Sequence, residues 1–289
     1  MTDFQRFIAQ AWNDHADDAA AVGARLDDRA VALATEPTHV PELARLGHHV
    51  FGEHLARWAD GIAWQQRVAA LPLADAVGRA TAERFVASLS LAGQSADPRP
   101  LMSPSDATWA TALAAASLAG HDATRAGQLF REALARFDAA GLPDTAPCVR
   151  ALAVTGNNLA ASLEERASRS DPERELMILA AQTARRFWAL AGGWLEIERA
   201  EYRLAHTWLK AGDAARARSH AQACLALIKA HGDVPLERYF GLEVGVLAAR
   251  AQGDAATAAA SLETMRQVFT ELAPDDQGWC RATLDALAT

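Results

Sequence analysis

The sequence predicts an all-α protein built from stacked pairs of antiparallel helices. Alanine is very frequent, while Gly and Pro lie mostly in short breaks between long stretches of helix-forming residues. A spacing also recurs three times: a Leu-Ala-like pair, a small residue twelve positions later, and a small or apolar residue seven positions beyond it. The three copies read Leu113-Ala114, Ala126, Ala133; Leu204-Ala205, Ala217, Cys224; and Gly245-Val246, Ala258, Met265. Because one such unit cannot bury its apolar face alone, its copies must stack into a solenoid.

The first elements expected are capping helices over residues 1–35. Phe4, Phe7, Ile8 and Trp12 form an apolar stripe at helical spacing. The repeat array is expected over residues 36–272. Its first unit starts near 43–47 and has Ala59 twelve positions after Gly47, but Gln66 stands where the second small residue belongs, and so this unit is degenerate.

The segment 73–105 is the least regular part of the array. A helix is expected over 79–91, but Pro98 and Pro100 exclude an ordinary helix directly after it. Residues 94–104 are therefore expected to form a surface loop, with a functional lid as the alternative.

The clearest repeats are expected at about 106–140, 198–231 and 239–272. Two of them have a Gly-Asp corner, Gly212-Asp213 and Gly253-Asp254, in which glycine ends one helix in the left-handed conformation and aspartate caps the next. A further unit opens at 157–160 and has an expanded corner at 166–172. Residues 273–289 are expected to form a C-terminal capping helix.

These residues resemble the tetratricopeptide repeat family, whose helix pairs carry the same Leu-Gly/Ala pair, Gly-Asp corner and spaced alanines. The resemblance implies a right-handed superhelical solenoid and a concave face lined by the first helix of each pair, where a peptide or protein segment binds. Carried over to this chain, it nominates these binding residues: His48, Phe51, Asn157, Asn158, Arg199, Tyr202, Arg203, His206, Glu243 and Arg250.

Composition and charge indicate which classes of binding partner and which cellular compartment to expect. The net charge of −8 argues against a broad grip on nucleic acid or on an anionic membrane. No run approaches the roughly 20 apolar residues of a membrane span, and the N-terminus lacks the pattern of a signal peptide, so a cytoplasmic location is expected. The three cysteines are far apart and include no C-x-x-C pair, which favours neither disulfides nor a cysteine zinc site.

Two clusters carry candidate chemistry. Arg199, Tyr202, Arg203 and His206 lie three and four positions apart on one helix, and their side chains suit a peptide terminus or an acidic side chain. In the second cluster, at 48–54, His49 and Glu53 share a helix face and are spaced to chelate a metal, while His48 and His54 point elsewhere. Partly exposed histidines without a metal are the alternative for that cluster.

The leading hypothesis is a bacterial-type, non-catalytic scaffold that binds a peptide or protein segment and needs no cofactor or metal. No nucleotide-binding loop, nucleophile elbow or H-E-x-x-H motif occurs, which disfavours common enzyme classes. One alternative is a sensor whose curvature changes when a peptide or small molecule binds. A metal-dependent enzyme using the 48–54 cluster is the other.

Overall fold

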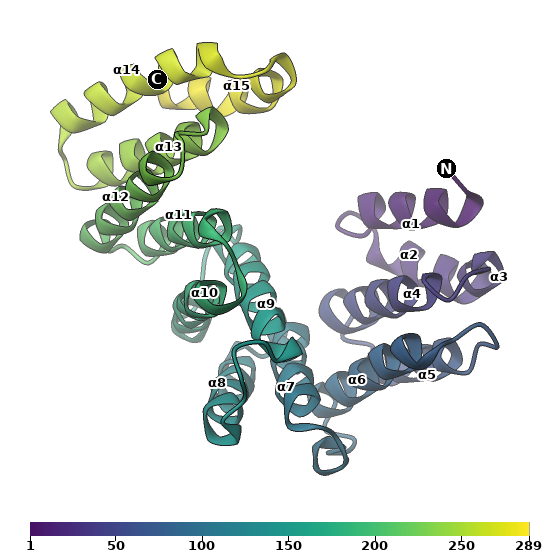
Figure 1. Cartoon of the computed structure of the whole chain (residues 1–289). Helices are drawn as coiled ribbons and strands as arrows, with labels where there is room; N and C mark the ends of the chain where they lie inside the picture. The colour runs from purple at the N-terminus through teal and green to yellow at the C-terminus, as the bar shows by residue number, and fades with distance from the viewer. Residues whose placement is uncertain (289) are drawn as a thin grey trace. The chain divides into compact units, whose positions relative to one another are not determined.

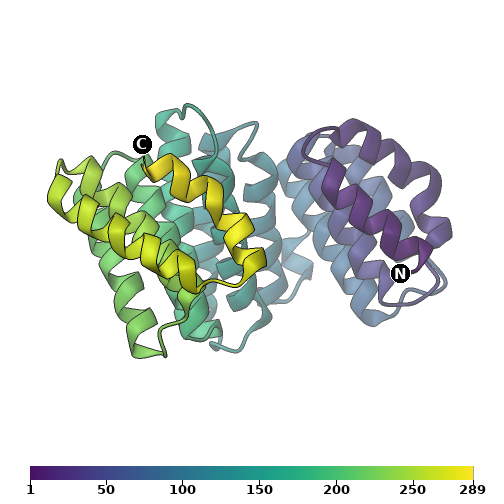
Figure 2. The ribbon, with the colours of Figure 1, turned by 90° about the horizontal axis from the view of Figure 1, so that it is seen from above.

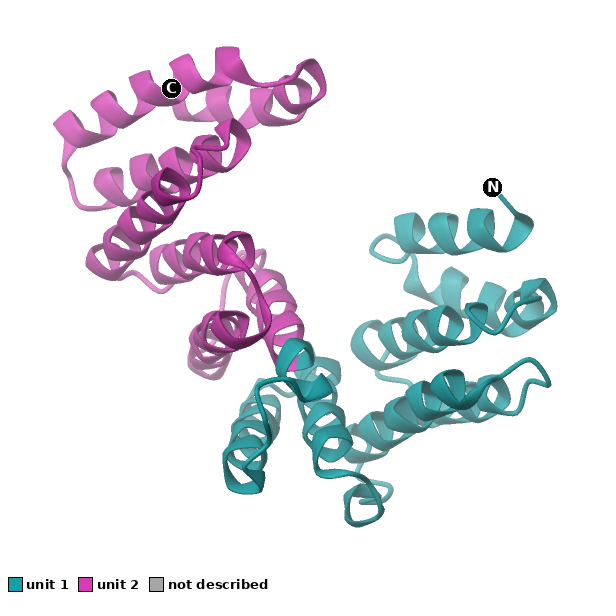
Figure 3. Ribbon diagram, viewed as in Figure 1, with its two compact units in different colours: residues 1–151 teal, residues 152–289 magenta. Residues whose placement is uncertain are grey.

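The computed structural model describes residues 1–288, which are helical and contain no β-strand in that range (Figure 1). The helices pack in adjacent pairs joined by short corners. The chain divides into two compact units, residues 1–151 and residues 152–289 (Figure 3). This boundary lies inside one helix, α9 (Pro147–Glu164), and was not anticipated from the sequence.

Unit 1 begins with several short helical segments and continues with longer helices. Its α-helices are α1 (Asp3–Asp14), α2 (Ala19–Arg25), α3 (Val31–Leu33), α4 (His39–Gly47), α5 (Trp58–Ala69), α6 (Ala76–Ala92), α7 (Pro104–Leu118) and α8 (Ala123–Ala140). Two π-helical segments interrupt the α-helical register, η1 (Leu26–Ala30) and η2 (His48–His54), and η3 (Arg99–Leu101) is a 3₁₀ turn. The side chains of Phe4 and Ile8 are buried, as the apolar stripe predicted.

Unit 2 contains the remainder of α9 and, among the described residues, six further helices. Its helices are α10 (Asp171–Ala191), α11 (Trp194–Lys210), α12 (Ala214–Ala230), α13 (Pro235–Ala251), α14 (Ala255–Glu271) and α15 (Pro274–Ala288). Consecutive helices from α11 to α14 pack on one another, and α15 packs against α14, as Figures 1 and 2 show.

The Gly-Asp corners form as the sequence predicted. Gly212 and Gly253 have φ values of +84° and +75°, a conformation that glycine adopts without a steric penalty. The carboxylate of Asp213 then accepts a hydrogen bond from the backbone N–H of Arg216 at 3.0 Å, and Asp254 caps α14 in the same way. The chain therefore reverses direction at these corners because of local chemistry.

The spaced residues of the repeats lie inside the protein. Ala126, Ala133, Ala217, Cys224, Ala258 and Met265 are all buried. Small side chains at these positions allow neighbouring helices to approach closely. The irregular segment 94–104 is a loop containing η3, and the guanidinium of Arg99 ties it to Asp97 and, at 2.8 Å, to Glu132 on α8. Among residues 1–288, no helix has both the length and the apolar character needed to cross a bilayer.

Candidate functional site

Most of the predicted binding residues lie on α11 in unit 2. Arg199, Tyr202, Arg203 and His206 follow one another at intervals of three, one and three residues, so they lie along one side of the helix. The Arg199 side chain is 60% exposed, whereas Tyr202, Arg203 and His206 are half-buried. Arg199 is therefore the most exposed of the four side chains.

Three of the four side chains, those of Arg199, Tyr202 and Arg203, form hydrogen bonds with carboxylates of the protein itself. The Tyr202 hydroxyl donates to Oε2 of Glu243 on α13 at 3.0 Å, and the Arg199 guanidinium donates to Glu237 on the same helix. On the other side, Nη1 of Arg203 donates to Glu164 at the end of α9. Arg199 and Arg203, which were expected to grip a ligand carboxylate, are thus each paired with a carboxylate of the protein itself.

His206 is the exception within this group. Its Nε2 atom is buried and has no hydrogen-bond partner among the described residues, and its ring packs edge-on against Tyr202, with centroids 4.6 Å apart. Burial, and then the positive charges of Arg203 and Lys210, lower its pKa to about 4. The imidazole is therefore neutral at pH 7.

A row of aromatic rings extends from this cluster across three helices. The Tyr202 ring packs against Phe240 on α13 at 5.9 Å, and Phe240 packs against Trp279 on α15 at 5.0 Å. Trp279 is 66% exposed. We refer to Tyr202, Phe240 and Trp279 as the aromatic row.

The sequence reasoning missed two members of the aromatic row. It placed Trp279 in the capping helix and did not consider Phe240. A signal for Phe240 was present, because Glu237, Phe240 and Glu243 are spaced by three residues and so share a side of α13.

A second set of ionisable groups lies on another side of α11 and was also missed. Glu198 is 1% exposed, and its Oε1 accepts from the Cys224 thiol on α12 at 2.7 Å. Burial raises the pKa of Glu198 to about 7, and the nearby Glu237 carboxylate adds to the rise. Glu201 accepts hydrogen bonds from Arg185 on α10 and His220 on α12, which tie α11 to both helices.

The remaining predicted binding residues of unit 2 are Asn157, Asn158 and Arg250. The amide of Asn157 donates to the side-chain oxygen of Asn158 at 3.3 Å, and Asn158 is exposed. The Arg250 guanidinium donates to the backbone carbonyl of Leu287 on α15. Arg250 thus fastens the last helix to α13.

In unit 1 the structure corrects two predicted binding residues. His48 is 2% exposed and Phe51 fully buried, so neither lies on a surface that a ligand reaches. The His48 ring stacks on Phe85, and its Nε2 lies 2.9 Å from the Ser88 hydroxyl. Their position follows from η2, because the wider π-helical turn rotates side chains away from their α-helical directions.

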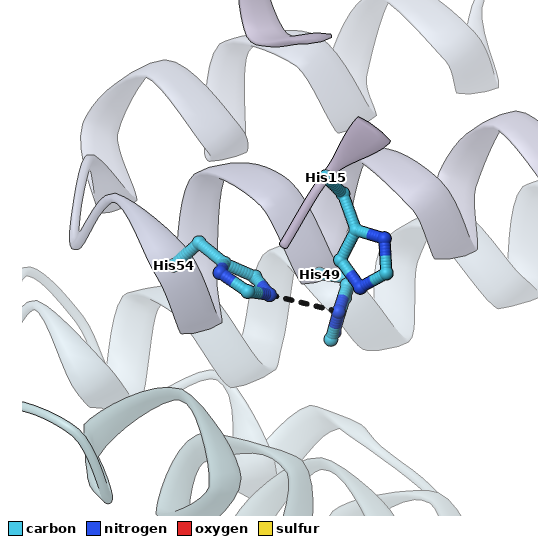
Figure 4. A group of neighbouring side chains, drawn as sticks. All are labelled: His15, His49 and His54. Carbon is cyan, nitrogen blue, oxygen red and sulfur yellow. Dashed lines mark hydrogen bonds between the residues drawn. The ribbon is translucent and has the colours of Figure 1, made fainter. Parts of the chain in front are cut away.

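The rest of the histidine cluster comes together with an additional member. His49 donates from Nδ1 to Glu53 at 2.8 Å, and the Nε2 atoms of His49 and His54 are 3.1 Å apart. His15, which follows α1, joins them (Figure 4). Although burial opposes it, hydrogen bonding to His48 and His49 holds the pKa of Glu53 well below its usual range.

Two hollows lie in unit 1. One, of about 300 Å³, is lined by residues 56–60 together with Ile62, Gly93 and Ser95. The other, of about 450 Å³, lies between α1 and the segment that includes Arg25 and Arg29. Neither is lined by residues of the aromatic row.

Comparison with known proteins gives little beyond this description. No family model matches the sequence, and no curated protein matches it. Among solved structures, the chain is similar to the crystal structure of BtubC (BKLC) from P. vanneervenii, with 16% sequence identity and a TM-score of 0.49 over 94% of this chain and 92% of that chain. A similarity at this level carries no information on function.

Proposed function

We propose that this chain is a non-catalytic scaffold that binds a peptide or protein segment on the face formed by α11, α13 and α15. The observation that carries the proposal is the aromatic row, which begins in a hydrogen-bonded cluster at Tyr202 and ends at the 66% exposed Trp279. Large aromatic side chains supply much of the binding energy at protein interfaces because they bury a large area while losing little conformational freedom.

The resemblance to tetratricopeptide repeats also favours this face of unit 2 as the binding surface. The first helix of each pair lines the concave side in that family, and α11 and α13 are the first helices of the α11–α12 and α13–α14 pairs. We propose that these pairs belong to a right-handed solenoid of that kind.

The ion pairs of Arg199 and Arg203 limit which chemical groups of a partner can bind at this face. Because Arg199 and Arg203 are paired with Glu237 and Glu164, a free carboxylate would have to displace an internal one. The aromatic row instead suits a segment that presents an apolar or aromatic side chain to Trp279 and Phe240. We therefore propose a peptide with such an anchor rather than a C-terminal carboxylate as the ligand.

The test is selection of a phage-displayed random peptide library on the purified chain, followed by fluorescence anisotropy of the selected peptides. Trp279→Ala removes an exposed side chain and leaves the cores intact; Leu101→Ala, in unit 1, removes another side chain that is 94% exposed and serves as the matched control. We expect the Trp279 variant to bind at least tenfold more weakly and the control to bind as wild type.

Two outcomes would overturn the proposal. One is that the selection enriches no binding peptide; the other is that the enriched peptides bind the Trp279 variant as tightly as wild type. Charge reversals at Arg199 or Arg250 are unsuitable for this test, because they would break contacts to Glu237 and to the backbone of Leu287.

A further inference from the structure

Three histidines from two distant segments meet at the surface of unit 1. His15 follows the end of α1, whereas His49 and His54 belong to η2. Their ring centroids lie 4.7 to 5.1 Å apart, and one nitrogen from each ring falls within 4.8 Å of the others. Figure 4 shows the three side chains directed at a common region.

The π-helical turn brings two of these rings together. In an α-helix, residues five positions apart are separated by about 1.4 turns and point in different directions. In η2 the backbone pairs five residues apart, as in the bond from the N–H of Leu55 to the carbonyl of Val50, so His49 and His54 fall on the same side. Isolated π-helical turns are often found at functional sites.

Hydrogen bonds at Nδ1 orient the rings of His15 and His49. The Nδ1 of His15 donates to the backbone carbonyl of Trp12 at 2.6 Å, and the Nδ1 of His49 donates to the carboxylate of Glu53 at 2.8 Å. A proton on Nδ1 leaves the lone pair on Nε2 available. Metal-binding histidines are commonly oriented in this way, by a carbonyl or a carboxylate on the other nitrogen.

The distance between the nitrogens of His49 and His54 fits a small tetrahedral cation. Two imidazole nitrogens bound at about 2.0–2.1 Å in tetrahedral geometry are separated by roughly 3.3 Å. The Nε2 atoms of His49 and His54 are 3.1 Å apart, so a shift of a few tenths of an ångström is enough for both to bind one ion. A fourth histidine, His121, donates instead to the backbone carbonyl of Glu53.

We propose that His15, His49 and His54 bind a zinc ion through their Nε2 atoms, with Glu53 as the positioning residue for His49. Three neutral nitrogen ligands favour Zn²⁺ over Mg²⁺ or Ca²⁺, which prefer oxygen. His15 and His49 are half-buried and His54 is more exposed, so the ion is accessible from solvent and water completes its coordination. This site is independent of the proposed peptide-binding face, which lies in unit 2.

The test uses the full chain without a histidine tag, freed of metal by a chelator and titrated with zinc chloride by isothermal titration calorimetry. We expect one equivalent of Zn²⁺ to bind and magnesium chloride to give no signal. His15→Ala and His54→Ala should abolish stoichiometric binding, and Glu53→Gln should weaken it by about 10- to 100-fold. His231→Ala, at a histidine of unit 2 that stacks on Trp194, is the matched control and should bind as wild type.

The proposal is overturned if wild type binds no zinc, or if one equivalent still binds to both His15→Ala and His54→Ala, because the ion would then sit elsewhere. Neither His15 nor His54 is fully buried, and unchanged far-ultraviolet circular dichroism will show that the variants are folded. Should one of them unfold, the other decides the outcome.

Discussion

The hydroxyl of Tyr202 on α11 donates a hydrogen bond to the carboxylate of Glu243 on α13, at 3.0 Å. Burial raises the pKa of Glu243, and this hydrogen bond opposes the rise. Burial also raises the pKa of Tyr202, which therefore stays protonated and remains a donor. The pair is a direct polar link between the first helices of two successive helix pairs.

Tyr202→Phe should destabilise the protein by about 1–3 kcal/mol, because it leaves a partly buried carboxylate without its donor while keeping the ring of the aromatic row. Urea unfolding at pH 7 measures the change. A double-mutant cycle with Glu243→Leu isolates the interaction from other effects of each substitution. A coupling energy near zero would show that the bond does not contribute.

Glu198 should make the stability of the protein fall as pH rises. Its ordinary pKa is 4.5, and burial raises it to about 7 in the folded state. Between these values the folded state holds a proton that the unfolded state has lost, so the free energy of unfolding decreases with pH across this window and levels off above it.

Glu198→Gln removes that dependence. Between pH 4.5 and pH 8 the free energy of unfolding of the variant should rise relative to that of wild type by roughly 3 kcal/mol. Unfolding in urea at several pH values measures the difference. If the difference between the two proteins stays constant across pH 4.5–7, Glu198 is ionised in the folded state and this prediction is wrong.

His206 should have the opposite effect at lower pH. Its pKa falls from an ordinary value of 6.5 to about 4, so between these values only the unfolded state takes up a proton. The free energy of unfolding therefore decreases as pH falls from 6.5 to 4. His206→Phe keeps the edge-on packing against Tyr202 and loses the titrating group. As pH falls through that window, the free energy of unfolding of this variant should rise relative to that of wild type by roughly 3 kcal/mol, which urea unfolding at several pH values measures. If the free energies of the two proteins change in parallel with pH, this prediction is wrong.

Features set by local chemistry were predictable from the sequence. The Gly212-Asp213 corner needs a residue that tolerates positive φ and a side chain that caps a helix, and both requirements are visible in adjacent letters. The burial of Ala217 and Cys224 followed from a spacing that repeats along the chain. The common side of Arg199, Tyr202, Arg203 and His206 followed from helical periodicity alone.

Features set by tertiary partners were not predictable in the same way. Arg203 was expected to face a ligand, but its partner Glu164 lies 39 positions earlier and is itself buried, so nothing near Arg203 in the sequence indicates that the charge is already paired. His48 was misplaced for a different reason: the change from α- to π-helical turns in η2 has no signature in residue type, yet it moves every side chain after Gly47 to a new direction.

Two glycines of unit 2 should respond in opposite ways to the same substitution. A Cβ atom added to Gly156 on α9 would lie 2.6 Å from the carbonyl oxygen of Ala180 and 3.0 Å from the amide nitrogen of Ala184, both on α10. Since both are backbone atoms, α9 and α10 would have to move apart. Gly156→Ala should therefore destabilise the protein by about 1–3 kcal/mol.

Gly245, in the interior of α13, has no atom within 4 Å of the corresponding position. Alanine there restricts the unfolded chain and favours the helix without a clash, so Gly245→Ala should stabilise the protein by about 0.5–1 kcal/mol. Urea unfolding of both variants beside wild type measures the two changes. Because the substitution is identical, opposite signs assign the difference to the close approach of α9 and α10. Stabilisation of both variants by equal amounts would instead show that the packing around Gly156 is loose enough to accommodate a methyl group.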